Sequence, residues 1–164
     1  MAFWSNPTTE PKRQYRFLIT NGSQDSVWYW VKNAQTPSFD INDGVYLLGN
    51  HKFKYPGTVN WNDVQISIVD DSNRIKDLYD TLVFGGYYPD ASQTDGVNKI
   101  NLSKNFTNGA DFQIVLLKAD GTPSDTWTLK NPWIKSANFG QLDYSSDELL
   151  TIDLTISYDR AEIT

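Results

Sequence analysis

The stretch from Trp127 to Asp159, WTLKNPWIKSANFGQLDYSSDELLTIDLTISYD, ends in the pattern that decides the fold class. From Leu150 to Tyr158 every second residue is apolar, and Thr, Asp, Thr and Ser stand between them. A period of two predicts a β-strand with one face on a core and the other face in water. The wet face carries hydroxyls and one carboxylate but no Lys, Arg or His, so it suits solvent better than catalysis.

Similar patterns recur along the chain and predict a mainly β protein. Strands are predicted at residues 14–20, 26–32, 63–69, 111–119, 124–129, 133–136 and 150–158. The first two are expected to pair through a turn at 21–23, and the fourth and fifth through a turn at 120–123. One helix is predicted at 72–84, where apolar residues recur at helical spacing before Gly85 and Gly86. We therefore expect a single domain, 1–164, an antiparallel β-sandwich or partial barrel with one α-helix.

Three segments lie outside this regular pattern. Residues 1–13 predict an extended N-terminal arm whose apolar Phe3 and Trp4 pack either on their own domain or on a neighbouring subunit. Residues 87–110 predict a variable surface loop. Residues 36–57 predict a hairpin in which Asp40–Gly44 looks like a turn and two short strands flank Gly49, Asn50 and His51. This hairpin either folds back on its own domain or projects and is covered by another subunit, because a monomer rarely exposes a large apolar patch.

Composition excludes several classes of protein. The chain has no cysteine, which rules out disulfides and thiolate chemistry, and a net charge of −6 with no basic footprint argues against tight nucleic-acid binding. No signal peptide is apparent at the start, and no apolar run approaches the ~20 residues of a membrane span, so we expect assembly in a cytoplasm without membrane contact.

The sequence predicts no active site, metal or cofactor. Its single histidine, His51, stands at a predicted turn, and zinc sites and Ser-His-Asp triads both need more than that. The acidic segment 40–44 lacks the spaced oxygen ligands and the terminal Glu of a calcium loop. Phosphate-binding glycine loops and nucleophile elbows are not found. We therefore expect a protein that is not an enzyme.

Four features in order resemble the tail tube proteins of contractile bacteriophage tails. They are a Trp-containing strand, the Asn131-Pro132-Trp133 corner, the Leu142–Ser145 step and a long alternating strand that ends in Tyr158-Asp159. The long hairpin before the strand 63–69, and the single helix after it, match the family's order over nearly the whole chain. The resemblance implies hexameric rings that stack into a tube, with a continuous inner β-barrel around a channel and the helix on the outside.

The resemblance also implies site residues and partners. The hairpin and the chain termini would bridge subunits and successive rings through Phe3, Trp4, Val45, Tyr46, Leu47, Leu48, Phe53 and Tyr55. Polar strand faces would line the channel through Gln65, Ser67, Thr151, Asp153, Thr155 and Ser157. Partners would be further copies of the chain and the sheath, baseplate and tail terminator proteins of a virion tail assembled in the bacterial cytoplasm. DNA would be a transported cargo, because a channel without cations does not bind phosphates.

Two alternatives stay open. The same fold could serve a baseplate or terminator protein, or the tube of a contractile injection system. A carbohydrate-binding β-sandwich is the other class, with Trp28, Trp30 and Trp61 as a platform that stacks on sugar rings.

Overall fold

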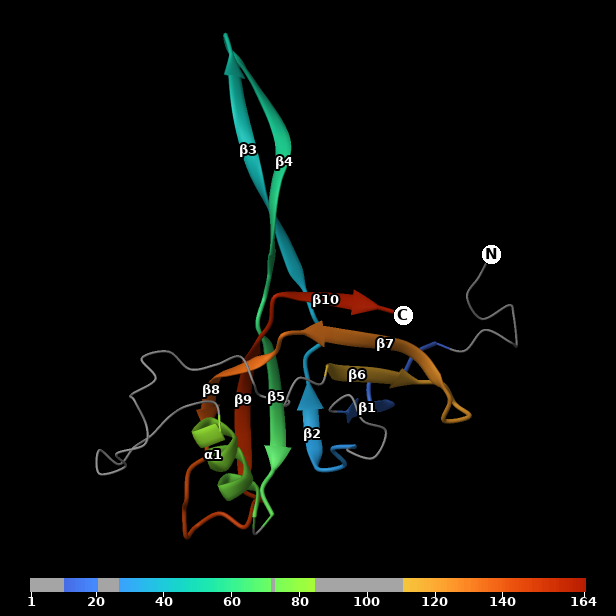
Figure 1. Ribbon diagram of the computed structural model, residues 1–164, viewed down its shortest axis with the longest axis vertical. Coiled ribbons are helices and arrows are strands. Elements are labelled where there is room, and N and C mark those ends of the chain that lie inside the picture. The colour runs from blue at the N-terminus through green and yellow to red at the C-terminus, as the bar shows by residue number, and fades with distance from the viewer. Residues whose placement is uncertain (1–10, 21–26, 72, 85–110) are drawn as a thin grey trace.

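The computed structural model describes residues 11–20, 27–71, 73–84 and 111–164, which form two antiparallel sheets and a long hairpin (Figure 1). Sheet A has the strand order β1-β6-β7-β10 and sheet B the order β2-β5-β9-β8. The strands of sheet A are β1 (Phe17–Thr20), β6 (Phe112–Leu117), β7 (Pro123–Lys130) and β10 (Arg160–Ile163). Those of sheet B are β2 (Val31–Ala34), β5 (Val64–Val69), β9 (Thr151–Ser157) and β8 (Trp133–Asn138). The predicted mainly β, antiparallel fold is confirmed.

The core lies between the two sheets and contains the apolar sides of the predicted alternations. In sheet B, Ile66 lies opposite Leu154, and Val64 and Ile68 lie opposite the neighbouring isoleucines of β9. From sheet A come Ile19, Phe112, Ile114 and Leu129. All these side chains are at most 2% exposed. Burial of each contributes about 1.5–3 kcal/mol relative to exposure, so the period of two is the main determinant of this fold.

Two adjacent corners carry the chain between the sheets. Asn131-Pro132 joins β7 of sheet A to β8 of sheet B, and Tyr158-Asp159 joins β9 of sheet B to β10 of sheet A. Asn131 has a φ of 53°, and its Nδ2 donates to Asp159 Oδ2 at 2.8 Å. The Asp159 amide also donates to the Lys130 carbonyl at 3.1 Å. The Asn-Pro-Trp corner and the Tyr-Asp strand end are therefore one bonded unit.

The segment after β1 differs from the prediction. Residues 26–32 were expected to form the antiparallel partner of 14–20, but β1 pairs with β6, and β2 begins only at Val31 and pairs with β5. Of the predicted hairpin, the described residues keep one bridge, Thr20 with Val27. The reason is that Trp28 and Trp30 pack against the core, so this segment crosses from sheet A to sheet B. The predicted turn at 21–23 lies outside the described residues.

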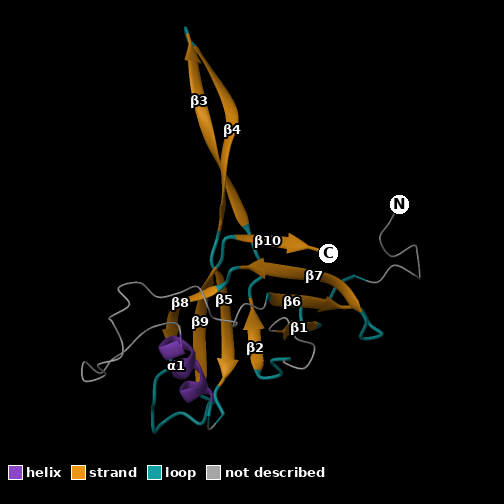
Figure 2. Cartoon of the chain, viewed as in Figure 1, coloured by secondary structure: helices purple, strands orange, loops and turns teal. Residues whose placement is uncertain are grey.

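Helix α1 spans Arg74–Phe84, within the predicted range 72–84. Just before it, the Asn73 amide donates to Asp71 Oδ1 at 3.2 Å. Leu78 packs against the buried cluster, whereas Ile75 and Tyr79 are about two-fifths exposed. Because Leu78 meets the apolar side chains of the core, α1 lies on the apolar side of sheet B, beside β8 and β9 in Figure 2. Among the described residues, no helix is long and apolar enough to span a membrane.

Strands β3 (Phe39–Leu48) and β4 (His51–Trp61) form a two-stranded sheet of their own that extends away from both larger sheets (Figure 1). The prediction that Asp40–Gly44 is a turn is wrong, because these residues continue β3. Two features let the strand continue. A register irregularity between Ile41 and Asp43 accommodates the Pro56-Gly57 segment opposite. Gly44 pairs with Tyr55, whose ring occupies the space that a Cβ at residue 44 would need.

Candidate assembly surfaces

The predicted channel residues form one face of sheet B. Gln65 lies opposite Thr155, and Ser67 lies opposite Asp153, with the Ser67 hydroxyl donating to Asp153 Oδ1. These side chains alternate with the core residues of β5 and β9, so they point away from the core. Thr151 and Ser157 continue the same side of β9. We call this surface the polar face. It comprises the β8 residues described in the next paragraph and Asp63, Gln65, Ser67, Thr151, Asp153, Thr155 and Ser157.

Strand β8 extends the polar face in a way that the sequence did not predict. Ser136 lies opposite Thr155 and Asn138 lies opposite Asp153, whereas Lys135 occupies an irregularity between Ile134 and Ser136. Lys135 Nζ donates to Asp63 Oδ2 at 2.6 Å. The Lys135 hydrogen bond, supported by one from Ser157, lowers the pKa of Asp63.

The predicted channel residues themselves include no cation, but Lys135 lies beside them, with its charge paired with the Asp63 carboxylate. The alternation of β9 could not predict that Lys135 lies beside this face. Lys135 is on β8, and an irregular register there decides which side of the sheet its side chain takes.

The hairpin β3–β4 exposes all six of the apolar residues predicted there as interface. Their exposed fractions are 50% for Val45, 60% for Tyr46, 62% for Leu47, 60% for Leu48, 48% for Phe53 and 55% for Tyr55. Phe39, Ile41 and Val59, which were not predicted, are each 51% exposed. The patch therefore runs from the tip of the hairpin to its base.

The register gives the outer half of the hairpin two different faces. Gly44, Tyr46 and Leu48 lie opposite Tyr55, Phe53 and His51 in turn, which makes one face largely aromatic. The His51 ring meets the Phe53 ring edge-on, with centroids 4.5 Å apart. On the other face Val45 and Leu47 lie opposite Lys54 and Lys52, so this side combines aliphatic and basic groups.

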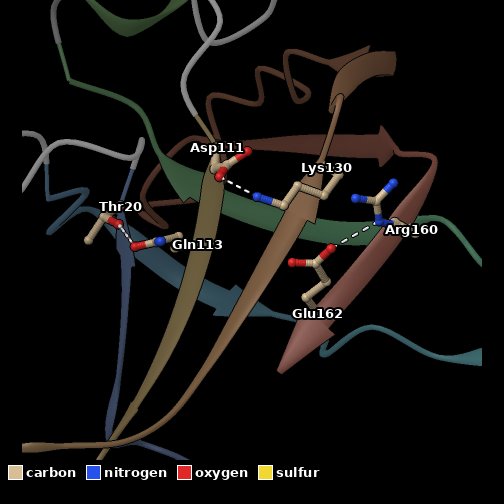
Figure 3. Close-up of polar contacts among 6 residues, drawn as sticks. All are labelled: Thr20, Asp111, Gln113, Lys130, Arg160 and Glu162. Carbon is tan, nitrogen blue, oxygen red and sulfur yellow. Dashed lines mark hydrogen bonds and ion pairs between the residues drawn. The ribbon is translucent and has the colours of Figure 1, made fainter. Parts of the chain in front are cut away.

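Both edges of sheet A carry polar contacts (Figure 3). At the β1 edge the Thr20 hydroxyl donates to Gln113 Oε1 at 3.3 Å, and at the β10 edge Arg160 pairs with Glu162 at 3.0 Å. Charged groups on a short edge strand discourage unspecific pairing with other chains. Among the described residues, β10 has one neighbouring strand, whereas the outer side of β1 also carries the single bridge of Thr20 with Val27.

The three tryptophans proposed as a sugar platform instead pack against the core. Trp28 stacks on Trp30 with centroids 6.2 Å apart and meets the Phe112 ring edge-on at 5.6 Å. Trp61 lies away from Trp28 and Trp30 and contacts Tyr158, with ring centroids 6.0 Å apart. Partly buried rings in two separate places do not form a flat exposed platform.

No catalytic constellation is present in the described part of the chain. Within it, no group of three or more His, Asp or Glu side chains could hold a metal ion, and His51 is exposed on the hairpin. Phe3, Trp4 and the predicted loop 87–110 lie outside the described residues.

Comparison with solved structures finds chains of similar fold that match nearly the whole length of this chain. A chain in the cryo-EM structure of the anti-feeding prophage tube-terminating cap is 20% identical, with a TM-score of 0.70 over 100% of this chain and 99% of that one. A chain in the sheath/tube terminator of the PVC extracellular contractile injection system is 17% identical, with a TM-score of 0.69 over 96% and 99%.

A third match comes from the six-fold symmetrised baseplate of the anti-feeding prophage, at 16% identity and a TM-score of 0.69 over 94% and 96%. No family model and no curated protein sequence matches the chain. At these identities the matches establish the fold, and they confirm at that level the resemblance to tail tube proteins.

Proposed function

We propose that this chain is a structural subunit of the tube in a contractile particle of the phage-tail class, and that six copies form a ring. Rings would then stack into a hollow tube surrounded by sheath, with baseplate and terminator proteins at its ends. The chain would have no catalytic role. The single observation that carries the proposal is the hairpin β3–β4, whose large apolar side chains are about half exposed along its whole length.

Physical chemistry connects that hairpin to assembly. Monomeric proteins rarely keep contiguous apolar patches larger than a few hundred Å², whereas a protein–protein contact would remove this patch from water. The edge strands of the sheets add a second driving force, because pairing with the next copy in a closed ring would satisfy their free backbone groups. Six-fold symmetry is supported by the baseplate structure in which a similar chain occurs.

The polar face of sheet B is the surface that we place toward the channel. Helix α1 covers part of the apolar side of this sheet, so the opposite side stays available to a lumen. Its hydroxyls, amides and one unpaired carboxylate, Asp153, would let DNA pass without binding it, as tail function in a virion requires. The same surface would suit the tube of an injection particle, and the matches to such particles favour that setting.

Electron microscopy of the purified chain over a range of concentrations tests the proposal. We expect rings or hollow tubes with a narrow channel, and sedimentation velocity should show a large species that grows with concentration. A chain that stays monomeric at its highest soluble concentration, and that does not cross-link into hexamers, would contradict a ring. Binding of that monomer to polysaccharide, with a change in Trp fluorescence, would favour the carbohydrate-binding alternative.

A further inference from the structure

A second exposed apolar patch lies on the loop 139–150, between β8 and β9. Leu142 is 85% exposed, Leu149 is 74% exposed and Tyr144 is fully exposed. This loop forms the lower end of the molecule in Figure 1, whereas the hairpin tip forms the upper end of the same long axis. The two patches are therefore at opposite ends of one chain.

Local hydrogen bonds give the loop a defined shape. The backbone amide and hydroxyl of Ser145 both donate to Asp143 Oδ1, at 2.9 and 2.8 Å, and these bonds lower the pKa of Asp143. The Gly140 amide donates to Asn138 Oδ1 at 3.1 Å, and a Cβ on Gly140 would come within 2.6 Å of the Thr151 carbonyl oxygen. The loop that carries the exposed apolar side chains therefore contains two hydrogen-bonded turns.

The loop also surrounds a hollow of about 350 Å³. Leu142, Leu149 and Leu150 contribute its apolar lining, and Asp143 and Glu148 contribute carboxylates. An open hollow with leucines and acids on its wall can receive an apolar side chain that has a cation beside it. A ligand of that chemistry is present elsewhere in this same chain.

The outer half of the hairpin has the complementary chemistry. Residues 45–54 contain Lys52, Lys54 and His51 and no acid, whereas residues 139–150 contain three acids and no Lys or Arg. Lys54 also pairs with Asp43 at 3.3 Å, which leaves Lys52, nearer the tip, as the better placed cation. Apolar side chains accompany both sets of charges, so the two ends match in polarity as well as in charge.

From this match we infer that the loop 139–150 of one copy receives the hairpin tip of a second copy. The inference rests on the proposed function and adds the surface that receives the hairpin, which we call the acceptor surface. A contact between two different surfaces of the same chain is head-to-tail, and it repeats without closing when the copies are stacked along an axis. Leu48 and Phe53 would enter beside Leu142 and Leu149, and Lys52 would face Asp147 and Glu148.

Engineered cysteines test this contact directly, because the chain has none of its own. The pair is Leu48→Cys at the tip and Leu142→Cys on the loop, both at exposed positions that should tolerate substitution. Assembled under reducing conditions and then oxidised, the double variant should give a ladder of covalent oligomers on a denaturing gel. Each single variant should stay monomeric on that gel, since a disulfide needs Cα atoms about 4.4–6.8 Å apart.

The outcomes separate the inference from the proposed function. Failure of the unmodified chain to assemble would overturn both. Tubes of the double variant that give no ladder would overturn the acceptor site alone, and a disulfide dimer from Leu48→Cys alone would show a tip-to-tip contact instead.

Charge reversal gives an independent measurement. Lys52→Glu should raise the concentration needed for assembly about tenfold, because a favourable pair becomes a repulsive one. Asp147→Lys with Glu148→Lys should have a similar effect, and the combined variant should regain much of the loss. If the combined variant assembles no better than Lys52→Glu alone or the Asp147→Lys, Glu148→Lys variant alone, a contact between these groups would be contradicted.

Discussion

Replacing Leu47 and Leu48 together with serine should weaken assembly without affecting the fold of the monomer. These leucines are 62% and 60% exposed and belong to opposite faces of the hairpin, so at least one is buried whichever face docks. Full burial of a leucine contributes about 1.5–3 kcal/mol, so burial of the remaining three-fifths contributes about 1–2 kcal/mol. The variant should therefore lose about 1–4 kcal/mol per contact.

That loss corresponds to a rise of about 5-fold to about 1,000-fold in the concentration at which tubes form, since each 1.4 kcal/mol is a factor of ten. The assay is sedimentation of assembled material over a dilution series, together with urea unfolding of the monomer. Unfolding should change by at most about 0.5 kcal/mol, as expected for exposed positions. Tyr29→Ser is the control, because Tyr29 is 80% exposed and the carbonyl of its neighbour Trp30 accepts a hydrogen bond from the Val69 amide, at the end of β5 away from the hairpin. Unchanged assembly with a clearly destabilised monomer would refute the reasoning, because it would mean that the leucines stabilise their own domain.

Three further predictions concern the core, an ion pair and the polar face. Leu154→Ala, at a position 1% exposed, should lower the free energy of unfolding by about 2–5 kcal/mol in urea titrations. Lys135→Met should cost less than about 1 kcal/mol at pH 7, because Lys135 is 54% exposed. Since the folded pKa of Asp63 is lowered, the pair stabilises the fold fully above the unfolded pKa near 4. The deficit of the variant should therefore shrink as the pH falls from there and disappear once the pH passes the folded pKa. Asp153→Lys with Thr155→Lys should still form tubes but impair DNA delivery by the particle, and normal delivery would argue against the polar face as channel wall.

The elements that the sequence predicted well are those with an intrinsic period. In β5 and β9 the period of two places Ile66 and Leu154 inward and Ser67 and Asp153 outward, and burial follows that pattern closely. The apolar runs around the Gly-Asn turn also predicted the hairpin, but they left open whether it folds back or projects, and the structure shows its apolar residues exposed. In each case the signal is local.

Elements that depend on distant partners were not predictable from local pattern. Strand β10 is only four residues long, Arg160–Ile163, and an alternation that short predicts little; it is a strand because it pairs with β7, with Arg160 opposite Lys130. Residues around Trp28 have strong strand propensity, but their rings bind the core and redirect the chain. Tertiary packing outweighs propensity at both places.

The charges on the polar face lead to a last inference about cargo. Asp63 and Lys135 cancel each other, so Asp153 is the charge that remains, and the Ser67 hydroxyl hydrogen-bonds to it. A ring of six copies would then carry six such carboxylates at one level of the channel. That arrangement repels phosphates weakly and attracts basic protein surfaces, so a DNA cargo should move freely whereas a basic protein cargo should be slowed in a salt-dependent way. Asp153→Asn would remove this ring of charge with almost no change in shape. The variant should therefore speed the passage of a basic protein cargo through the tube and leave the passage of DNA nearly unchanged.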